Sequence, residues 1–285
     1  MPRITLTPDQ PFSLDLSLSC GQVFSWEKEG GVWTGVVGSR VIRITQRGDS
    51  LSFSGADPGF IRHYFGLDDD LPDILSSIDR DPIIHAAIER NRGLRIIRQP
   101  PWECLASYIC ATYANIPGIK RRIFLLRQNL GDPVPGRRDG VYSFPSPHTL
   151  AGAEPCVLSG CRLGYRSAYL AKTARLIAGD PAWEERVHRL PYREAQKELL
   201  RFSGVGKKVA DCVLLFAFGK WEAFPVDTWI QRIITTCYPD AGPLKTYDQI
   251  SAFCRSHFGP WAGYAQEYLY CHRTTLARPC GDLSP

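Results

Sequence analysis

The stretch from Tyr192 to Gly219, YREAQKELLRFSGVGKKVADCVLLFAFG, constrains the fold of this chain most. Apolar residues recur at helical spacing on both sides of Gly204-Val205-Gly206. Glycines at this position allow the backbone to reverse in a tight turn. The sequence therefore predicts a helix that ends near Phe202, a short hairpin, and a second helix that begins at about residue 206.

The hairpin is suited to binding phosphate. Both glycines can adopt backbone angles closed to other residues, and neither carries a side chain. The hairpin amides and the positive end of the second helix can therefore approach a phosphate directly. We predict that Gly204, Val205, Gly206 and Lys207 bind the backbone of a nucleic acid. A plain pair of helices with a glycine cap is the structural alternative.

Lys208 lies in the first turn of the second predicted helix, beside Lys207. The neighbouring ammonium group and the positive helix end both disfavour the charged form of its amine. Only a neutral amine can attack an electrophile. We predict that Lys208 is a nucleophile, although a surface lysine that contacts phosphate is the alternative for any Gly-Lys-Lys sequence.

A carboxylate follows the hairpin at a fixed place. The segment EAFPVDTWIQRII puts Asp227 at the N-cap of another predicted helix, and capping is its simplest role. Cleavage of an N-glycosidic bond builds positive charge on the sugar. A fixed carboxylate stabilises that charge while an amine captures C1′. The hairpin lysine and the downstream aspartate together supply both groups.

Charge agrees with a polyanionic partner without identifying one. The net charge is +5, and residues 101–285 hold 23 Lys and Arg against 16 Asp and Glu, whereas residues 1–100 hold 11 against 13. The basic excess thus falls in the part that contains the hairpin, as a phosphate-binding surface requires. Many enzymes with other substrates share such an excess, so the motifs decide.

The predicted fold is α+β, with an N-terminal antiparallel sheet domain (1–100, with short helices) and an all-α helix–hairpin–helix domain (101–285). Apolar and polar residues alternate in short segments separated by glycine turns, which predicts strands over 12–18, 23–26, 32–37, 41–45 and 51–55. Helical spacing follows over 59–66, 72–92, 102–114, 118–130, 168–179, 192–202, 206–218, 228–237, 246–258 and 261–276. The stretch 131–160, rich in Pro and Gly, is interpreted as a long connection.

Several classes of protein are disfavoured. The ten cysteines lack the dense spacing of a disulfide framework, so we expect mostly reduced, buried thiols. Cys237, Cys254, Cys271 and Cys280 are too far apart for compact iron–sulfur spacing, so no cluster is predicted. The N-terminus lacks the apolar core of a signal peptide, and no apolar run is long enough to span a bilayer. We expect an intracellular protein with no membrane partner, in the cytoplasm at the nucleoid if it is prokaryotic.

The residues match a known pattern. GVGKKVADC followed by FPVDTW resembles the helix–hairpin–helix, Gly/Pro-rich loop and aspartate signature of DNA base-excision glycosylases. SCGQVFSW, RQPPWECLASYICATYANI, LGYRSAYL and FGPWAGYAQEYLY resemble, in that order and over nearly the whole chain, the 8-oxoguanine DNA glycosylases. The resemblance implies a lesion pocket in the cleft between the two domains.

The resemblance also implies a reaction and a set of substrate contacts. Lys208 would displace 8-oxoguanine flipped from double-stranded DNA, form a Schiff base with the sugar and permit β-elimination of the 3′ phosphate, with Asp227 assisting the first step. Cys212 and Tyr270 would sandwich the flipped purine, Gln266 would bind its Watson–Crick edge, and the Gly21 carbonyl would accept the N7 hydrogen that guanine lacks. Cys212 is i+4 from Lys208 and Tyr270 is i+4 from Gln266, so each pair shares a helix face.

Further contacts follow from the same resemblance. Tyr165 would wedge into the base stack and Arg166 would point to the orphaned base. Asn115 and Trp229 would also contact DNA. The carbonyls of Leu200, Phe202 and Val205 match positions where family members hold a monovalent or calcium ion, so at most a structural ion is expected, with no other cofactor required. We expect the protein to act as a monomer.

Three residues depart from the eukaryotic members of the family. Tyr113 stands where an asparagine occupies the vacated space, Gly118 where an arginine helps to read cytosine, and Trp229 where a histidine contacts phosphate. We therefore expect weak selectivity for the base opposite the lesion.

Two other functions stay open at this point. An alkylated-base glycosylase uses the same fold and an aspartate, but attacks with water and needs no hairpin lysine. A non-catalytic module would use the hairpin only to hold DNA.

Overall fold

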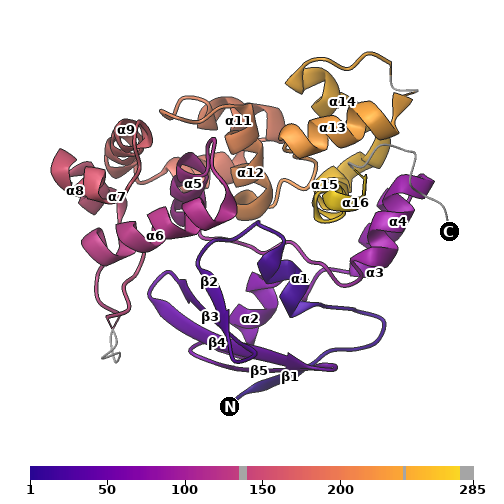
Figure 1. The fold of residues 1–285 in the computed structure, drawn as a ribbon, viewed down its shortest axis with the longest axis horizontal. Coiled ribbons are helices and arrows are strands. Elements are labelled where there is room, and N and C mark those ends of the chain that lie inside the picture. The colour runs from indigo at the N-terminus through magenta and orange to yellow at the C-terminus, as the bar shows by residue number, and fades with distance from the viewer. Residues whose placement is uncertain (135–139, 240–241, 277–285) are drawn as a thin grey trace.

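The computed structural model describes residues 1–134, 140–239 and 242–276. A five-stranded antiparallel sheet precedes a helical body, which confirms the predicted α+β class (Figure 1). The first elements are β1 (Arg3–Thr5), α1 (Leu14–Ser19), β2 (Trp26–Glu29), β3 (Val32–Val37), β4 (Arg40–Arg47), β5 (Ser50–Ser54), α2 (Pro58–Tyr64), α3 (Leu71–Ile78) and α4 (Pro82–Arg90).

The remaining described elements are helices. They are α5 (Pro101–Cys110), α6 (Ile116–Leu130), α7 (Pro147–Ala151), α8 (Pro155–Gly160), α9 (Arg166–Ala178), α10 (Trp183–Arg189), α11 (Tyr192–Leu199), α12 (Lys207–Phe218), α13 (Thr228–Cys237), α14 (Tyr247–Phe258), the 3-10 helix η2 (Gly259–Trp261), α15 (Ala262–Cys271) and α16 (Arg273–Leu276). Within the described ranges, each helix is too short or too polar to cross a bilayer.

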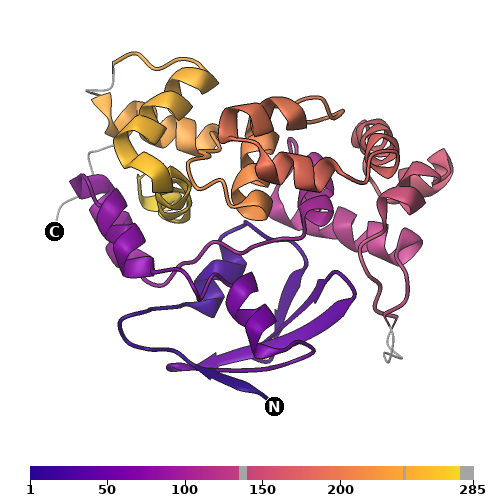
Figure 2. The same cartoon turned by 180° about the vertical axis from the view of Figure 1, so that it is seen from behind.

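The sheet has strand order β1-β5-β4-β3-β2, and every neighbouring pair is antiparallel. Ile44 of β4 pairs with Trp33 on one side and with Phe53 on the other. These side chains are buried with Leu14 and Ile61 from α1 and α2. The two helices therefore cover the face of the sheet that is directed toward the helical body, as Figures 1 and 2 show from opposite sides.

The strand predicted over 12–18 is wrong, because this segment forms α1. Alternating Phe12, Leu14, Leu16 and Leu18 fit a strand, but Leu14 and Leu18 also lie one helical turn apart and are both buried. The Ser13 hydroxyl accepts the Leu16 N–H (3.3 Å) and caps the helix. The Gln46 side chain of β4 binds both the Leu14 N–H and the Phe12 carbonyl, which fixes α1 to the sheet.

The single helix predicted over 72–92 is also wrong, because α3 ends before Asp79 and α4 starts at Pro82. Proline has no amide hydrogen to continue a helix, and Asp81 accepts the N–H groups of Ile83 and Ile84 as a new N-cap. The predicted boundary at residue 100 places both helices in the sheet domain, yet their apolar faces join the core of the helical body beside α15. Figure 1 shows them next to α15 and α16.

Besides α1 and η2, three short helices were not predicted. Two of them, α7 and α8, fall in the supposed connection 131–160, and α10 follows α9. Pro147 and Pro155 occupy the first turn of α7 and α8, where a missing amide hydrogen costs nothing. Prolines interpreted as loop markers are therefore helix starts here. The predicted helix over 261–276 is divided into α15 and α16 at His272.

Candidate active site

The predicted hairpin joins α11 to α12, and its two glycines serve different purposes. Gly204 has φ +82°, and a Cβ there would lie 2.7 Å from the Tyr169 Cβ, so both conformation and space require glycine. Gly206 has φ −95° and ψ 178°, which any residue adopts, so the predicted conformational need is wrong for this position. A Cβ on Gly206 would meet nothing within 4 Å, which leaves the approach to the N-terminus of α12 open.

The two hairpin lysines point to different partners. The Lys207 Nζ binds the Asp248 carboxylate of α14 at 2.5 Å on the surface. The Lys208 Nζ lies over the ring of Tyr108 from α5, 5.1 Å from its centroid. Adjacent residues on a helix point about 100° apart, and here that angle separates a surface cation from an inward one.

Lys208 lines a cavity of about 120 Å³. All six predicted catalytic and substrate-binding residues line it together: Gly21, Lys208, Cys212, Asp227, Gln266 and Tyr270. They come from the segment after α1, from α12, from the start of α13 and from α15. Residues up to 249 positions apart in sequence thus share one small space, which only the tertiary fold can bring about.

Asp227 is the N-cap of α13 and a wall of the cavity at once. Its Oδ1 accepts the Ile230 N–H at 2.8 Å, which fixes the carboxylate at the positive end of the helix. From the sequence, capping and catalysis are alternative roles for this carboxylate. The structure shows the cap, and the cap holds the carboxylate beside the cavity that Lys208 lines.

Cys212 on α12 and Tyr270 on α15 both line the cavity. Burial raises the pKa of the Cys212 thiol to about 12, so it is present as a neutral thiol that can pack on a ring. Tyr270 is partly buried, and the Arg273 guanidinium lies 4.1 Å from its ring centroid. The Gln266 side chain is 5% exposed, and its Oε1 is buried without a hydrogen-bond partner. A buried, unpaired amide oxygen costs free energy that a donor on a ligand would recover.

Gly21 has φ +107°, and a Cβ there would lie 3.1 Å from Ile116 Cδ1 in the cavity wall. The following residue is held firmly: the Gln22 side chain binds Ser17, Arg95 and Ile97 backbone groups. The Gln22 backbone carbonyl accepts hydrogen bonds from the Gln99 and Tyr108 side chains. The backbone around Gly21 is therefore fixed against α5 and the cavity.

Some residues of the cavity were not predicted. These are Phe24, Tyr108, Ala111, Ala114, Ile116, Ile119, Phe216, Pro225 and Glu267. The apolar members read from sequence as ordinary core residues. Glu267 did carry a signal, because it is the one charged residue in the helix segment AGYAQEYLY. It is 4% exposed, and the Cys20 thiol donates to its Oε2 at 3.6 Å.

The pKa of Glu267 is raised to about 7, chiefly by burial. The other groups that act on it are Cys20, Arg273, Asp227 and Lys208. The folded protein therefore holds this proton more tightly than the unfolded chain does. Its contribution to the free energy of unfolding is present at low pH and is lost as the pH rises through about 7.

We expect Glu267→Gln to gain stability relative to the wild type between pH 5 and pH 8. The difference in the free energy of unfolding, variant minus wild type, should rise by about 2–3 kcal/mol over this range. Glutamine keeps the shape but has no proton to lose. Denaturant unfolding of both proteins at the two pH values measures this. Glu194→Gln on the exposed face of α11 is the control. A stability difference that does not change with pH would contradict the prediction.

The residues predicted to contact DNA differ in how exposed they are. Tyr165 is 52% exposed and Trp229 is 39% exposed, as a surface contact requires. The exposed Asn115 caps α6 by accepting the Gly118 N–H at 2.9 Å. Arg166 is 6% exposed, and its guanidinium binds the carbonyl oxygens of Thr112, Tyr113 and Leu163. Its contact with the orphaned base stays a prediction.

The proposed ion site lies in the hairpin turn. The Phe202 carbonyl, one of the three predicted ligands with Leu200 and Val205, accepts the Val205 N–H at 3.2 Å.

Of the four cysteines whose spacing argues against an iron–sulfur cluster, Cys280 lies outside the described residues.

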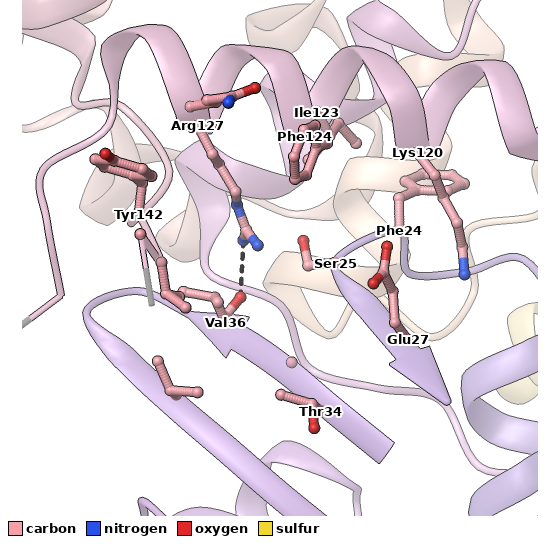
Figure 3. Close-up of a pocket in the computed structure, with 15 residues that line it drawn as sticks. Phe24, Ser25, Glu27, Thr34, Val36, Lys120, Ile123, Phe124, Arg127 and Tyr142 are labelled. Carbon is pink, nitrogen blue, oxygen red and sulfur yellow. Dashed lines mark hydrogen bonds between the residues drawn. The ribbon is translucent and has the colours of Figure 1, made fainter. Parts of the chain in front are cut away.

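A larger cavity, of about 280 Å³, lies elsewhere, between the sheet and α6. Figure 3 shows Arg127 extending from α6 to the Val36 carbonyl of β3, a hydrogen bond of 2.8 Å. Arg127 also binds the buried Glu103 carboxylate at 2.6 Å. The cavity contains none of the predicted site residues, and its mostly apolar lining and structural ion pair give it no evident chemistry. Size alone therefore does not identify the site.

Comparison with known proteins agrees with this geometry. Residues 4–105 match the family described as 8-oxoguanine DNA glycosylase, N-terminal domain. A protein named probable N-glycosylase/DNA lyase, from Methanothermobacter thermautotrophicus, is 33% identical over 74% of this chain and 73% of its own length. The N-glycosylase/DNA lyase OGG1 of Arabidopsis thaliana is 28% identical over 90% of this chain and 76% of its own length.

A solved structure extends the match. The 8-oxoguanine glycosylase/lyase of Clostridium acetobutylicum, in complex with double-stranded DNA containing cytosine opposite 8-oxoguanine, superposes with a TM-score of 0.87 at 30% identity. The superposition covers 93% of this chain and 92% of that one. Sequence relatives, the N-terminal family match and the fold agree, and the chain belongs to the 8-oxoguanine DNA glycosylase family.

Proposed function

We propose that this protein excises 8-oxoguanine from duplex DNA and then cleaves the strand at the resulting site, with Lys208 as nucleophile. The observation that supports this most is the shared cavity of Lys208 and Asp227, an amine and a carboxylate delivered by two different helix starts. A water-dependent glycosylase has no need of an amine beside its carboxylate. The names of the relatives, N-glycosylase/DNA lyase, agree with a two-step reaction.

The reaction begins at C1′ of an extruded nucleotide. The neutral Lys208 amine forms a bond to C1′ while the bond to the purine N9 breaks, and the base leaves with that electron pair and takes up a proton. Asp227 stabilises the positive charge that develops on the sugar. Opening of the sugar ring gives the Schiff base, loss of a C2′ proton expels the 3′ phosphate, and water releases the enzyme.

Recognition of the base rests on fixed groups around the cavity. Cys212 and Tyr270 pack on the two faces of the purine, and the unpaired Gln266 Oε1 accepts a donor from its Watson–Crick edge. The fixed Gly21 carbonyl accepts the N7 hydrogen of 8-oxoguanine, which guanine does not have. Extrusion costs base pairing and stacking, which favours a base that gains these contacts.

The surrounding duplex is held by the hairpin. The open N-terminus of α12 and Gly206 receive a phosphate, and Lys207 exchanges its surface ion pair with Asp248 for that phosphate. A structural ion on the carbonyls of Leu200, Phe202 and Val205 stays a prediction.

Borohydride trapping tests the proposal. We expect the wild-type protein, mixed with an 8-oxoguanine duplex and borohydride, to form a covalent protein–DNA adduct, because reduction fixes the Schiff base. An undamaged duplex of the same sequence is the control. Base release without an adduct would favour a water-dependent glycosylase, and binding without base release would favour a non-catalytic module.

A further inference from the structure

Two buried acids lie near Lys208, and their hydrogen bonding differs. Asp211 of α12 is fully buried, and its carboxylate accepts hydrogen bonds at 2.5–2.9 Å from three side chains, those of Tyr192, Gln196 and Tyr247. Buried polar groups are normally satisfied in this way. Asp211 is not among the residues that line the Lys208 cavity. It therefore serves to fasten α12 to α11 and α14.

Glu267 of α15 lacks such donors. Among the described residues, its carboxylate accepts one side-chain hydrogen bond, from the Cys20 thiol at 3.6 Å, and it forms no ion pair. The same thiol also has the Ser17 carbonyl as an acceptor at 3.6 Å, so its single hydrogen serves both. A thiol is moreover a weak donor. Burial of an acid with so little compensation costs free energy, and acids of this kind gather at functional sites.

Glu267 lines the same cavity as Lys208 and Asp227. The cavity is small, about 120 Å³, so groups on its walls can exchange a proton directly or through one water molecule. The charge of Lys208 acts on the Glu267 carboxyl group. The unsatisfied acid therefore lies where the proposed chemistry takes place.

The titratable and charged groups around Glu267 come from the segment after α1 and from α5, α12, α13, α15 and α16. They are Cys20, Tyr108, Lys208, Cys212, Asp227, Tyr270, Cys271 and Arg273. Burial raises the pKa of the thiols and phenols among them, so these groups stay neutral at pH 7. Since burial also raises the pKa of Glu267 to about 7, this acid can both take up and release a proton near neutral pH.

The proposed reaction requires a proton to leave one group and to arrive at another. Lys208 attacks only as a neutral amine, and the departing purine gains a proton. Asp227 is unsuited to carry this proton, because it has to keep its negative charge while positive charge develops on the sugar. Glu267 has no such task and lines the same cavity.

We propose that Glu267 is a general acid–base residue of base excision, which takes a proton from Lys208 and gives it to the departing purine. This inference rests on the proposed function and deepens it. The ionised carboxylate removes a proton from the Lys208 ammonium group, which leaves a neutral amine and a neutral carboxyl group. The amine nitrogen bonds to C1′ while the bond from C1′ to N9 breaks. The purine leaves with that electron pair and takes the proton from Glu267, which is ionised again.

The pH dependence of base release tests this role. Glu267 must be ionised to accept the proton, so the wild-type rate should fall as the pH drops below about 7, by nearly tenfold per pH unit. Glu267→Gln should release 8-oxoguanine about 10²-fold more slowly at pH 7.5 and should lack this inflection. Single-turnover rates are measured with subsaturating enzyme between pH 5.5 and 9, on a duplex with cytosine opposite the lesion, and alkali cleaves every abasic site before detection.

Further variants separate proton transfer from a structural role. Glu267→Asp keeps a carboxyl group and should retain the inflection, with a rate within about tenfold of the wild type. Glu267→Ala should be as slow as Glu267→Gln. Added formate, a small carboxylate that fits the vacated space, should raise its rate by about tenfold, whereas chloride at the same ionic strength should not. Glu194→Gln, on the exposed face of α11, should keep the wild-type rate and profile.

The outcomes separate this inference from the proposed function. Wild-type protein that releases no base and forms no borohydride adduct overturns the proposed function and this inference with it. Active wild-type protein without an inflection near pH 7 overturns this inference alone, and this measurement decides the matter even if a variant does not fold. A loss in Glu267→Gln that is the same at every pH, or a Glu267→Ala variant that formate does not rescue, would assign Glu267 a structural role instead.

Discussion

Lys208→Gln is expected to abolish base excision, with a loss of about 10³-fold or more in the single-turnover rate. The lysine amine lines the same cavity as Asp227, and glutamine has no nucleophilic amine to replace it. Because the side chain is of similar length and the hairpin is unchanged, binding to 8-oxoguanine duplex should be retained. Base excision is measured as strand cleavage on a gel after alkali has cleaved every abasic site, and binding is measured by fluorescence anisotropy.

Two other lysines make this result specific. Lys197→Gln is the same chemical change on the exposed face of α11, in the same motif, and should behave as the wild type. Lys207→Gln removes the surface lysine paired with Asp248 and should weaken binding, with a smaller salt dependence, rather than stop chemistry. Retained base excision by Lys208→Gln would show that the attacking group is something other than this amine.

Asp227→Asn should slow base release by about 10²–10³-fold while leaving the fold intact. Asparagine is as good an N-cap as aspartate, so the hydrogen bond to the Ile230 N–H is kept and only the negative charge is lost. That charge matters when positive charge develops on the sugar. An abasic site formed beforehand has already passed this step, so the variant should still form a trapped Schiff base with it.

Asp57→Asn is the matched control for this substitution. Asp57 caps α2 by accepting the Phe60 N–H at 2.8 Å, in the N-terminal part of the chain and away from the cavity. Its variant should excise 8-oxoguanine at the wild-type rate. If Asp227→Asn released the base at the wild-type rate as well, the carboxylate would be a helix cap and nothing more.

Sequence reasoning succeeded where the signal is local. The hairpin between α11 and α12, Lys208 in the first turn of α12 and Asp227 as the N-cap of α13 follow from glycine, capping and periodicity within about ten residues. It failed where two local patterns coincide. Leu14 and Leu18 fit a strand and a helix equally well, and the Ser13 cap with the Gln46 contact from β4 decided for the helix.

In the site, too, local sequence predicted some features and tertiary packing determined the others. The spacing on α12 indicated that Lys208 and Cys212 share a helix face, and the spacing on α15 indicated the same for Gln266 and Tyr270. Only packing determined that these two faces meet with Gly21 around one cavity. Nothing local shows that Arg166 binds the carbonyls of another turn. Nor does local sequence tell that Glu267 is buried enough to hold its proton near pH 7.

The sequence by itself thus determined the backbone motifs and the kinds of reactive group they carry, because capping, turn formation and helical periodicity depend on neighbours along the chain. Only the tertiary structure decided which polar groups face the cavity and which are paired elsewhere. Those outcomes depend on desolvation and on hydrogen bonds between segments far apart in sequence, and these arise only when the helical body closes on the sheet.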